Sequence, residues 1–291
     1  MSGETEERLR SLGYVAGGPA VGPHLDALDP KSALPLFRDF ERAMEREASG
    51  DLKASSLILT RLVARDPANL TFRRSLGSAL RRSSRAREAV SVLKEAARYA
   101  PQDAAVLHDL ALALAGQGDL VEAIEVEDRA IALDAAFVDA LNHLATLHAL
   151  QGDFVKGRNA VDRALALDAN NARAWSNRGN IARAQRQTEE AGRSYERAIA
   201  LAPEQAEAWN GLGVLEVERG RFDEAARRFE RVLEVDPGFD EARLNLAVVE
   251  LQRGRPDRAR ELAAETNRGA RDPALRAKAA AFLRDLRAAA R

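Results

Sequence analysis

Small and apolar residues recur along this chain at a constant interval of thirty-four residues, for example between Trp175 and Trp209. An alanine precedes each of these tryptophans, and a glycine follows each of them by four residues. The repeat interval holds without insertion from residue 36 to residue 273. It divides this part of the chain into seven repeats: 36–69, 70–103, 104–137, 138–171, 172–205, 206–239 and 240–273. Repetition on this scale is typical of solenoid architectures, in which each repeat is one structural element.

Two positions of every repeat are occupied by small residues. The eighth position holds Ala43, Gly77, Ala111, Ala145, Gly179, Gly213 and Ala247. A second position holds Ser55, Ala89, Ala123, Gly157, Ala191, Ala225 and Ala259. Small side chains allow two antiparallel helices to approach closely, and a larger side chain there would overpack by roughly 1–3 kcal/mol. The pattern therefore predicts a pair of antiparallel helices in each repeat, with these residues where the helices cross.

Turn residues mark the predicted ends of the helices. Between the two helices of four repeats lies a glycine that can adopt the left-handed backbone that ends a helix: Gly50, Gly118, Gly152 and Gly220. The second helices of four repeats end before a proline, which disfavours helical geometry in the preceding residue: Asp66-Pro67, Ala100-Pro101, Ala202-Pro203 and Asp236-Pro237. A single helix pair cannot bury its own apolar stripe, so neighbouring repeats are expected to stack on one another.

This pattern resembles the tetratricopeptide repeat family over residues 36 to 273. The resemblance implies an all-α, right-handed solenoid in which the first helix of each repeat lines a concave groove that binds a protein or peptide. Four residues depart from the family's pattern. Apolar residues are expected where Asp39 and Arg42 stand, a leucine where Arg178 stands, and an aromatic residue where Glu127 stands. These departures are expected to weaken single repeats without disturbing the interval.

Different structures are predicted at the two ends of the repeats. Asp272-Pro273 indicates the start of a final helix over residues 274–291, because aspartate is a good helix cap and proline suits the first turn. Its apolar side consists of Leu275, Ala279, Phe282 and Leu286. Such a helix would be the solvating cap that a terminal repeat requires. Residues 1–31 are predicted to form an N-terminal arm and a linker rich in glycine and proline.

Four asparagines are predicted to line the groove: Asn142, Asn177, Asn210 and Asn245. A side-chain amide can pair with both the N–H and the C=O of an extended peptide backbone. The row can therefore act as a ladder for a bound peptide. The alternative is that asparagine is simply common at these positions of such repeats.

Charged residues of the predicted groove alternate in sign. The cations are Arg74, Arg81, Arg82, Arg173 and Arg183, and the acidic residues between them include Asp109 and Asp139. Because no sustained basic stripe results, no nucleic-acid partner is predicted, and a solvated face of mixed charge is the alternative to a binding role. Some family members hold a C-terminal carboxylate with a clamp of lysine, asparagine and arginine. Asp109 and Asp139 take positions of that clamp where cations belong, which argues against this ligand.

The last two complete repeats place an apolar stripe on the predicted groove side: Val214, Val217, Leu244, Val248 and Leu251. An exposed apolar patch usually has a partner. The C-terminal helix can fold over the stripe, an amphipathic helix of a partner can dock on it, or a second copy of the chain can pack against it.

Composition narrows the classes of function. The chain has 291 residues with 44 Lys+Arg and 45 Asp+Glu, so no global field attracts it to nucleic acid or to an anionic membrane. Cysteine is absent, which excludes disulfides and cysteine-ligated metals. We find no nucleophile or acid–base set with a closed pocket, and predict neither catalysis nor a cofactor. His108 and His143 fall on adjacent repeats near Asp109 and Asp139; we interpret these as ordinary polar groove residues and predict no metal site.

The segment ERLRSLGYVAGG at residues 7–18 differs from the repeats that follow it. Together with the linker, Asp-Pro-Lys at 29–31 and the repeats, it resembles the C-terminal tail of bacterial sulfatase-like hydrolases that carry such repeats. The resemblance implies an accessory module without its catalytic domain, because the family's Cys/Ser-x-Pro-x-Arg motif is absent. The alternative is a plain N-terminal arm that packs on the first repeat.

The N-terminal residues MSGETEERLR lack the apolar core of a signal peptide. This predicts a cytoplasmic chain, or a periplasmic or extracellular one if the chain is a module of an exported protein.

Overall fold

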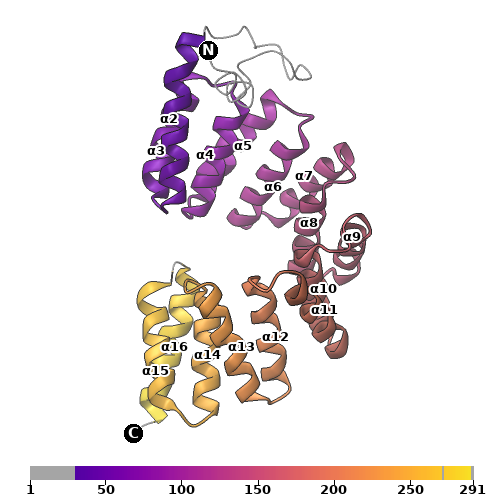
Figure 1. Ribbon diagram of the computed structural model, residues 1–291, viewed down its shortest axis with the longest axis vertical. Helices are drawn as coiled ribbons and strands as arrows, with labels where there is room; N and C mark the ends of the chain where they lie inside the picture. The colour runs from indigo at the N-terminus through magenta and orange to yellow at the C-terminus, as the bar shows by residue number, and fades with distance from the viewer. Residues whose placement is uncertain (1–29, 271, 290–291) are drawn as a thin grey trace. The chain divides into compact units, whose positions relative to one another are not determined.

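The computed structural model describes residues 30–270 and 272–289, and every regular element among them is an α-helix (Figure 1). The predicted all-α fold is therefore confirmed for these residues. The segment 7–18 and the rest of the predicted arm up to residue 29 lie outside the described residues. Among the described helices, none is both long and apolar enough to cross a lipid bilayer.

The chain divides into two compact units, Met1–Gln151 and Gly152–Arg291, here called the N-terminal and C-terminal units. The helices of the N-terminal unit are α2 (Pro30–Ala48), α3 (Leu52–Arg65), α4 (Leu70–Arg82), α5 (Ala86–Tyr99), α6 (Ala104–Gln117), α7 (Leu120–Leu133) and α8 (Val138–Leu150). Those of the C-terminal unit are α9 (Phe154–Leu167), α10 (Ala172–Ala184), α11 (Thr188–Leu201), α12 (Ala206–Glu218), α13 (Phe222–Val235), α14 (Asp240–Gln252), α15 (Pro256–Gly269) and α16 (Pro273–Ala289).

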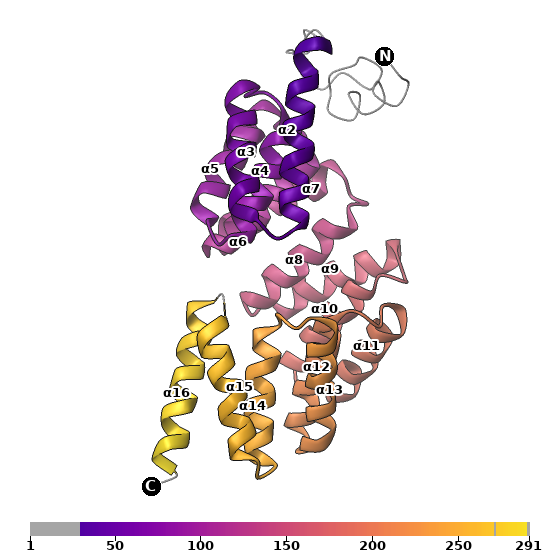
Figure 2. The same cartoon turned by 60° about the vertical axis from the view of Figure 1, so that its left-hand side comes forward.

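From α2 to α15 the even-numbered helices are the first helices of the predicted repeats and the odd-numbered helices are the second, while α16 is the final helix that follows the repeats. From α4 to α14 the first helices begin at positions 70, 104, 138, 172, 206 and 240, so each begins one repeat interval after the one before. Within each unit successive helices contact each other, for example as the hairpins of α4 with α5 in the N-terminal unit (Figure 1) and of α14 with α15 in the C-terminal unit (Figure 2).

One residue in each turn between a first and a second helix has a positive φ. These residues are Gly50, Ser84, Gly118, Gly152, Arg186, Gly220 and Gly254, each one repeat interval after the one before. At Gly118 φ is 98°, and the N–H of the next residue, Asp119, donates to the carbonyl of Leu114 at 3.0 Å. This is the hydrogen bond that closes a helix end through a left-handed residue. The turn geometry therefore follows the repeat interval even where the residue is not glycine.

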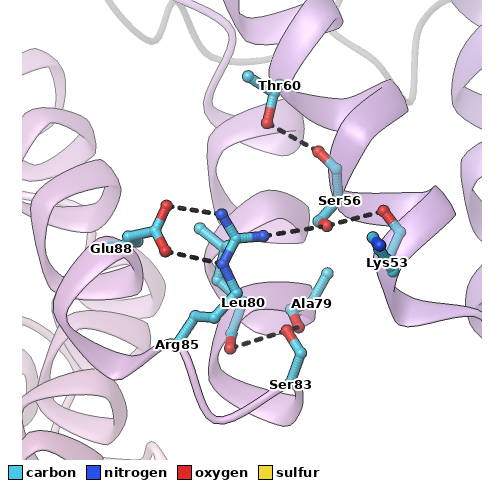
Figure 3. Close-up of polar contacts among 8 residues, drawn as sticks. All are labelled: Lys53, Ser56, Thr60, Ala79, Leu80, Ser83, Arg85 and Glu88. Carbon is cyan, nitrogen blue, oxygen red and sulfur yellow. Dashed lines mark hydrogen bonds and ion pairs between the residues drawn. The ribbon is translucent and has the colours of Figure 1, made fainter.

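Local hydrogen bonds of the flanking residues Ser83 and Arg85 (Figure 3) support the turn that contains Ser84, whose φ is 60°. The Arg85 guanidinium binds both carboxylate oxygens of Glu88, with Nε–Oε1 at 2.7 Å and Nη2–Oε2 at 2.6 Å. The Ser83 hydroxyl donates to the carbonyl of Ala79 at 2.7 Å. The hydrogen bond from Arg85 holds the pKa of Glu88 below its usual value. These contacts hold a left-handed conformation that L-residues other than glycine adopt at a cost of about 1–2 kcal/mol.

We expect Ser84→Gly to raise the free energy of unfolding by about 0.5–1 kcal/mol, because glycine removes the left-handed strain and loses only part of that gain to backbone entropy. Ser83→Gly is the matched control one residue earlier, where φ is −94°. It is expected to destabilise, since it removes a hydroxyl hydrogen bond and gains nothing from glycine. Urea unfolding measures both changes, and a loss of stability for both variants would contradict the assigned strain.

The small residues predicted at the helix crossings are buried in every repeat. The reason is direct contact with large side chains of the partner helix. A Cβ added to Gly77 of α4 would lie 2.6 Å from Cγ of Leu93 on α5, and one added to Gly213 of α12 would lie 2.7 Å from Cε1 of Phe229 on α13. These distances are far below van der Waals contact, so the close approach of the two helices requires the absence of a side chain.

The two ends of the described chain differ slightly from the predicted boundaries. Helix α2 begins at Pro30, so residues 30 and 31 belong to a helix and not to the predicted linker. Helix α16 begins at Pro273, and the Ala274 N–H donates to Asp272 Oδ1 at 2.8 Å, as expected for an aspartate cap. Ala279 of α16 lies in the same core cluster as Leu244 of α14. The final helix therefore extends the stack of the C-terminal unit (Figure 2).

Candidate protein-binding face

First helices of neighbouring repeats contact each other within each unit. In the N-terminal unit α4 contacts α6 and α6 contacts α8; in the C-terminal unit α10 contacts α12 and α12 contacts α14, and α14 also contacts the final helix α16. We call the surface of these even-numbered helices the first-helix face, taken separately for each unit. It contains the residues that the sequence assigned to the groove.

Charged side chains of the first-helix face pair between neighbouring first helices. Arg74 Nε on α4 donates to Asp109 Oδ2 on α6 at 2.5 Å. Arg183 Nη1 on α10 donates to Glu218 Oε1 on α12 at 2.9 Å. Both pairs join residues 35 positions apart, one more than the repeat interval, so neighbouring first helices lie against each other with an offset of one residue. Part of the alternation of sign seen in the sequence is therefore intramolecular pairing between neighbouring first helices.

The same offset recurs at the end of α2, where Glu47 accepts a hydrogen bond from Arg82 of α4. The side chains of Arg74 and Asp109 remain 41% and 24% exposed, and a part-exposed ion pair contributes about 0–1 kcal/mol. These pairs consequently fix the charge pattern of the face more than they stabilise the fold. Burial, the largest single effect, would lower the pKa of Arg183, but the hydrogen bond to Glu218 together with the charge of Glu218 and the interactions with Tyr195 outweighs it, and the pKa is raised.

The four predicted asparagines have different surroundings. Asn245 Nδ2 on α14 donates to Asn210 Oδ1 on α12 at 3.4 Å, again with the offset of one residue. Both are half-buried, as is Asn177 on α10. Asn142 on α8 is 0% exposed, so its amide is part of the interior and does not reach the surface where a peptide would lie. The structure places Asn210 and Asn245 in direct contact.

Of the remaining charged residues that were predicted for the groove, Arg81, Asp139 and Arg173 are exposed. Each lies on a first helix: Arg81 on α4, Asp139 on α8 and Arg173 on α10. They add one acidic and two basic groups to the first-helix face, which keeps its charge mixed.

The predicted apolar stripe is largely covered. Leu244 is 8% exposed and belongs to the core, because it packs in one cluster with residues of α13, α15 and α16. Val214, Val217 and Leu251 are half-buried, and the first two pack against the same cluster. Val248 is exposed, at 38%. Leu244 is therefore a structural residue, and the stripe offers Val248 as its main accessible apolar group.

Two residues that depart from the family's pattern have specific polar partners that the sequence did not indicate. Arg178 on α10, in place of a leucine, binds Glu190 Oε1 on α11 at 3.0 Å. Arg158 on α9 binds the same carboxylate, and its hydrogen bond is the main reason that the pKa of Glu190 lies below its usual value. The second departure, Glu127 on α7, lies between His108 and His143. From the sequence, these histidines were expected near Asp109 and Asp139 instead.

The tandem hairpins and the row of first helices define an α-helical repeat protein. Three family models described as tetratricopeptide repeat match residues 75–136, 170–237 and 216–282. The chain therefore carries tetratricopeptide repeats in these regions, as the sequence pattern predicted. No curated protein sequence matches the chain.

Several solved structures share the fold. A tetratricopeptide repeat protein from Parabacteroides merdae is 16% identical, with 87% of this chain and 99% of that chain covered and a TM-score of 0.70. A chain of the APC/C hetero-tetramer Cut9-Hcn1 is 17% identical, with 97% and 51% covered and a TM-score of 0.68, so this chain spans about half of its length. A thermophilic TPR protein from Thermus thermophilus is 22% identical, with 61% and 97% covered and a TM-score of 0.57.

Proposed function

We propose that the chain is a non-catalytic scaffold that binds a protein or an extended peptide on its first-helix face. Repeats of this class generally serve as protein-interaction modules. The observation that carries the proposal is the pair of amides formed by Asn210 and Asn245 on neighbouring first helices. Its internal hydrogen bond uses one N–H of Asn245 and the oxygen of Asn210.

The amide groups that are not used in this hydrogen bond can pair with a peptide backbone. Asn210 retains its amide nitrogen as a donor, and Asn245 retains its amide oxygen as an acceptor. A peptide group offers one C=O and one N–H, so one residue of an extended chain can satisfy both. The mixed charge of the surrounding face favours a partner with both signs of charge over a polyanion such as nucleic acid.

A displayed library of random peptides, selected on the immobilised full chain, tests the proposal. We expect enriched peptides whose affinity falls at least tenfold in the double variant Asn210→Ala/Asn245→Ala, since each lost amide leaves a backbone group of the bound peptide unpaired. The matched control is Asn159→Ala/Asn267→Ala, which makes the same change on the second helices α9 and α15 of the same unit. Failure to enrich any peptide, or an equal loss in the control, would contradict binding on this face.

A second candidate is an accessory module that recruits a substrate for a sulfatase-like hydrolase. It rests on the resemblance of residues 7–18, taken together with the linker, Asp-Pro-Lys at 29–31 and the repeats that follow, and residues 7–18 lie outside the described residues. Its test is a reading frame that joins these repeats to a sulfatase catalytic domain, followed by co-purification of the two parts.

Self-association through the apolar stripe is a weaker candidate, because Leu244 is buried. It predicts a dimer in light scattering that Val248→Asp dissociates.

A further inference from the structure

Three ionisable side chains from three successive helices of the N-terminal unit converge in its interior. His108 on α6 and His143 on α8 both contact one oxygen of Glu127 on α7, with Nδ1–Oε1 distances of 2.7 Å and 3.0 Å. The two imidazole rings meet edge to face, with centroids 5.7 Å apart. The three residues are 8%, 6% and 0% exposed, in the order His108, His143, Glu127. One ligand atom from each lies within 4.8 Å of the others.

Glu127 occupies a position of the repeat that is otherwise apolar. The corresponding residues of the other repeats, spaced by the repeat interval, include Leu59, Leu93, Val161, Tyr195 and Phe229, all of them at most 1% exposed. A carboxylate in such a place costs several kcal/mol unless opposite charge or hydrogen bonds compensate both of its oxygens. The histidines compensate only Oε1. Glu127 Oε2 is buried without a hydrogen-bond partner among the described residues.

A divalent cation accounts for this arrangement better than hydrogen bonds alone. Two imidazole nitrogens and one carboxylate oxygen are a ligand set that zinc uses in proteins, at about 2.0–2.2 Å from the ion. Ligands around a tetrahedral ion at that radius lie about 3.3 Å apart, so the observed 2.7 Å and 3.0 Å require outward shifts of a few tenths of an ångström. The unpartnered Oε2 lies on the same carboxylate and is available to the ion as well. The positive charge of the ion compensates the buried carboxylate.

We propose that His108, Glu127 and His143 bind one divalent transition-metal ion, for which Zn²⁺ is the first candidate because its ligand preferences match two imidazoles and a carboxylate. The site joins α6, α7 and α8, which belong to two successive repeats. A bound ion therefore links these repeats and stabilises the N-terminal unit, since it binds the folded chain and not the unfolded one. Phe137, whose ring centroid lies 5.0 Å from that of His108, covers one side of the site.

The test uses the full chain after treatment with a chelator, titrated with Zn²⁺ by calorimetry and with Co²⁺ by visible absorption. We expect one ion per chain, a tetrahedral Co²⁺ spectrum, and a higher Tm with Zn²⁺ than without it. Glu127→Gln, which keeps the shape and removes the charge, is expected to weaken Zn²⁺ binding at least about 100-fold. The control is His148→Gln, which changes another buried histidine of α8 that is not part of the trio and is expected to leave the affinity within about threefold.

A second variant separates loss of the ion from loss of the fold. Glu127→Leu restores the residue type found at this position in other repeats, and is expected to keep the helix content in circular dichroism while binding no ion at the site. Absence of Zn²⁺ uptake by the native chain, native affinity in Glu127→Gln, or equal losses in Glu127→Gln and His148→Gln would each overturn the proposal. None of these outcomes bears on peptide binding, which is assigned to Asn210 and Asn245 of the other unit.

Discussion

We expect Phe229→Ala to lower the free energy of unfolding by about 3–5 kcal/mol. Phe229 lies on α13, is 0% exposed, and packs its ring over Gly213 of α12. Alanine would leave a cavity at the crossing of the two helices, because the surrounding side chains relax only partly. In a stack of repeats this loss also weakens the contacts with the next hairpin. Urea unfolding followed by far-ultraviolet circular dichroism measures the change.

Val155→Ala on α9 is the control for this truncation. Val155 is 68% exposed, so its removal is expected to change the free energy of unfolding by less than about 0.5 kcal/mol. Comparable losses in the two variants would contradict the placement of Phe229 in the core of the C-terminal unit.

We expect Gly211→Ala to lower the free energy of unfolding by roughly 1–3 kcal/mol, although alanine is the better helix former. A Cβ at Gly211 of α12 would lie 2.4 Å from Cε1 of Tyr195 on α11, and one at Gly179 of α10 would lie 2.6 Å from the same atom. The ring is thus held between two glycines. It cannot move aside easily, because it is fully buried and its hydroxyl donates to Asn180 Oδ1 at 2.8 Å. Burial raises the pKa of Tyr195 to about 12, so the hydroxyl remains a donor at neutral pH.

Gly192→Ala on α11 is the same chemical change, but we expect it to raise the free energy of unfolding. A Cβ there would meet Cδ2 of Leu215 at 3.6 Å, which is ordinary contact. Only the gain in helix propensity remains, and we expect stabilisation by up to about 1 kcal/mol. Stabilisation by both substitutions in urea unfolding would contradict the close contact between Gly211 and Tyr195.

The constant repeat interval made most of the fold predictable, because small residues at a helix crossing and glycines at a helix end have few substitutes. Four turns were marked directly by a glycine: Gly50, Gly118, Gly152 and Gly220. Ser84 and Arg186 did not mark theirs, since their side chains give no sign of a left-handed backbone, and only their position in the interval identifies them. The start of α2 was also missed, because Asp-Pro-Lys fits both a linker and the first turn of a helix.

The candidate face was less predictable than the fold. The sign of each charge could be read from the sequence, but not the offset of one residue between neighbouring first helices, which pairs Arg74 with Asp109. The same offset places Asn210 beside Asn245. Burial was a second unknown: Asn142 and Leu244 were predicted to line the groove but lie inside the protein. A pattern on one helix does not reveal what the neighbouring helix covers.

At Glu127 the sequence indicated an unusual residue but not its partners. The sequence marked it as a departure from an aromatic position, and a charge at a buried position is itself a signal of a polar partner. Its partners, His108 and His143, come from the two neighbouring first helices and were identifiable only once the helices were placed. The sequence prediction of no metal site considered Asp109 and Asp139, and not this carboxylate.

Backbone chemical shifts of the isotopically labelled full chain test the central claim most directly, because they report φ residue by residue. The repeat account predicts positive φ at Ser84 and Arg186, as at the five glycines of the equivalent turns, with helical shifts on both sides of each turn. Negative φ at these two residues, or extended shifts where α4 to α14 are placed, would contradict a chain built from helix hairpins at one constant interval.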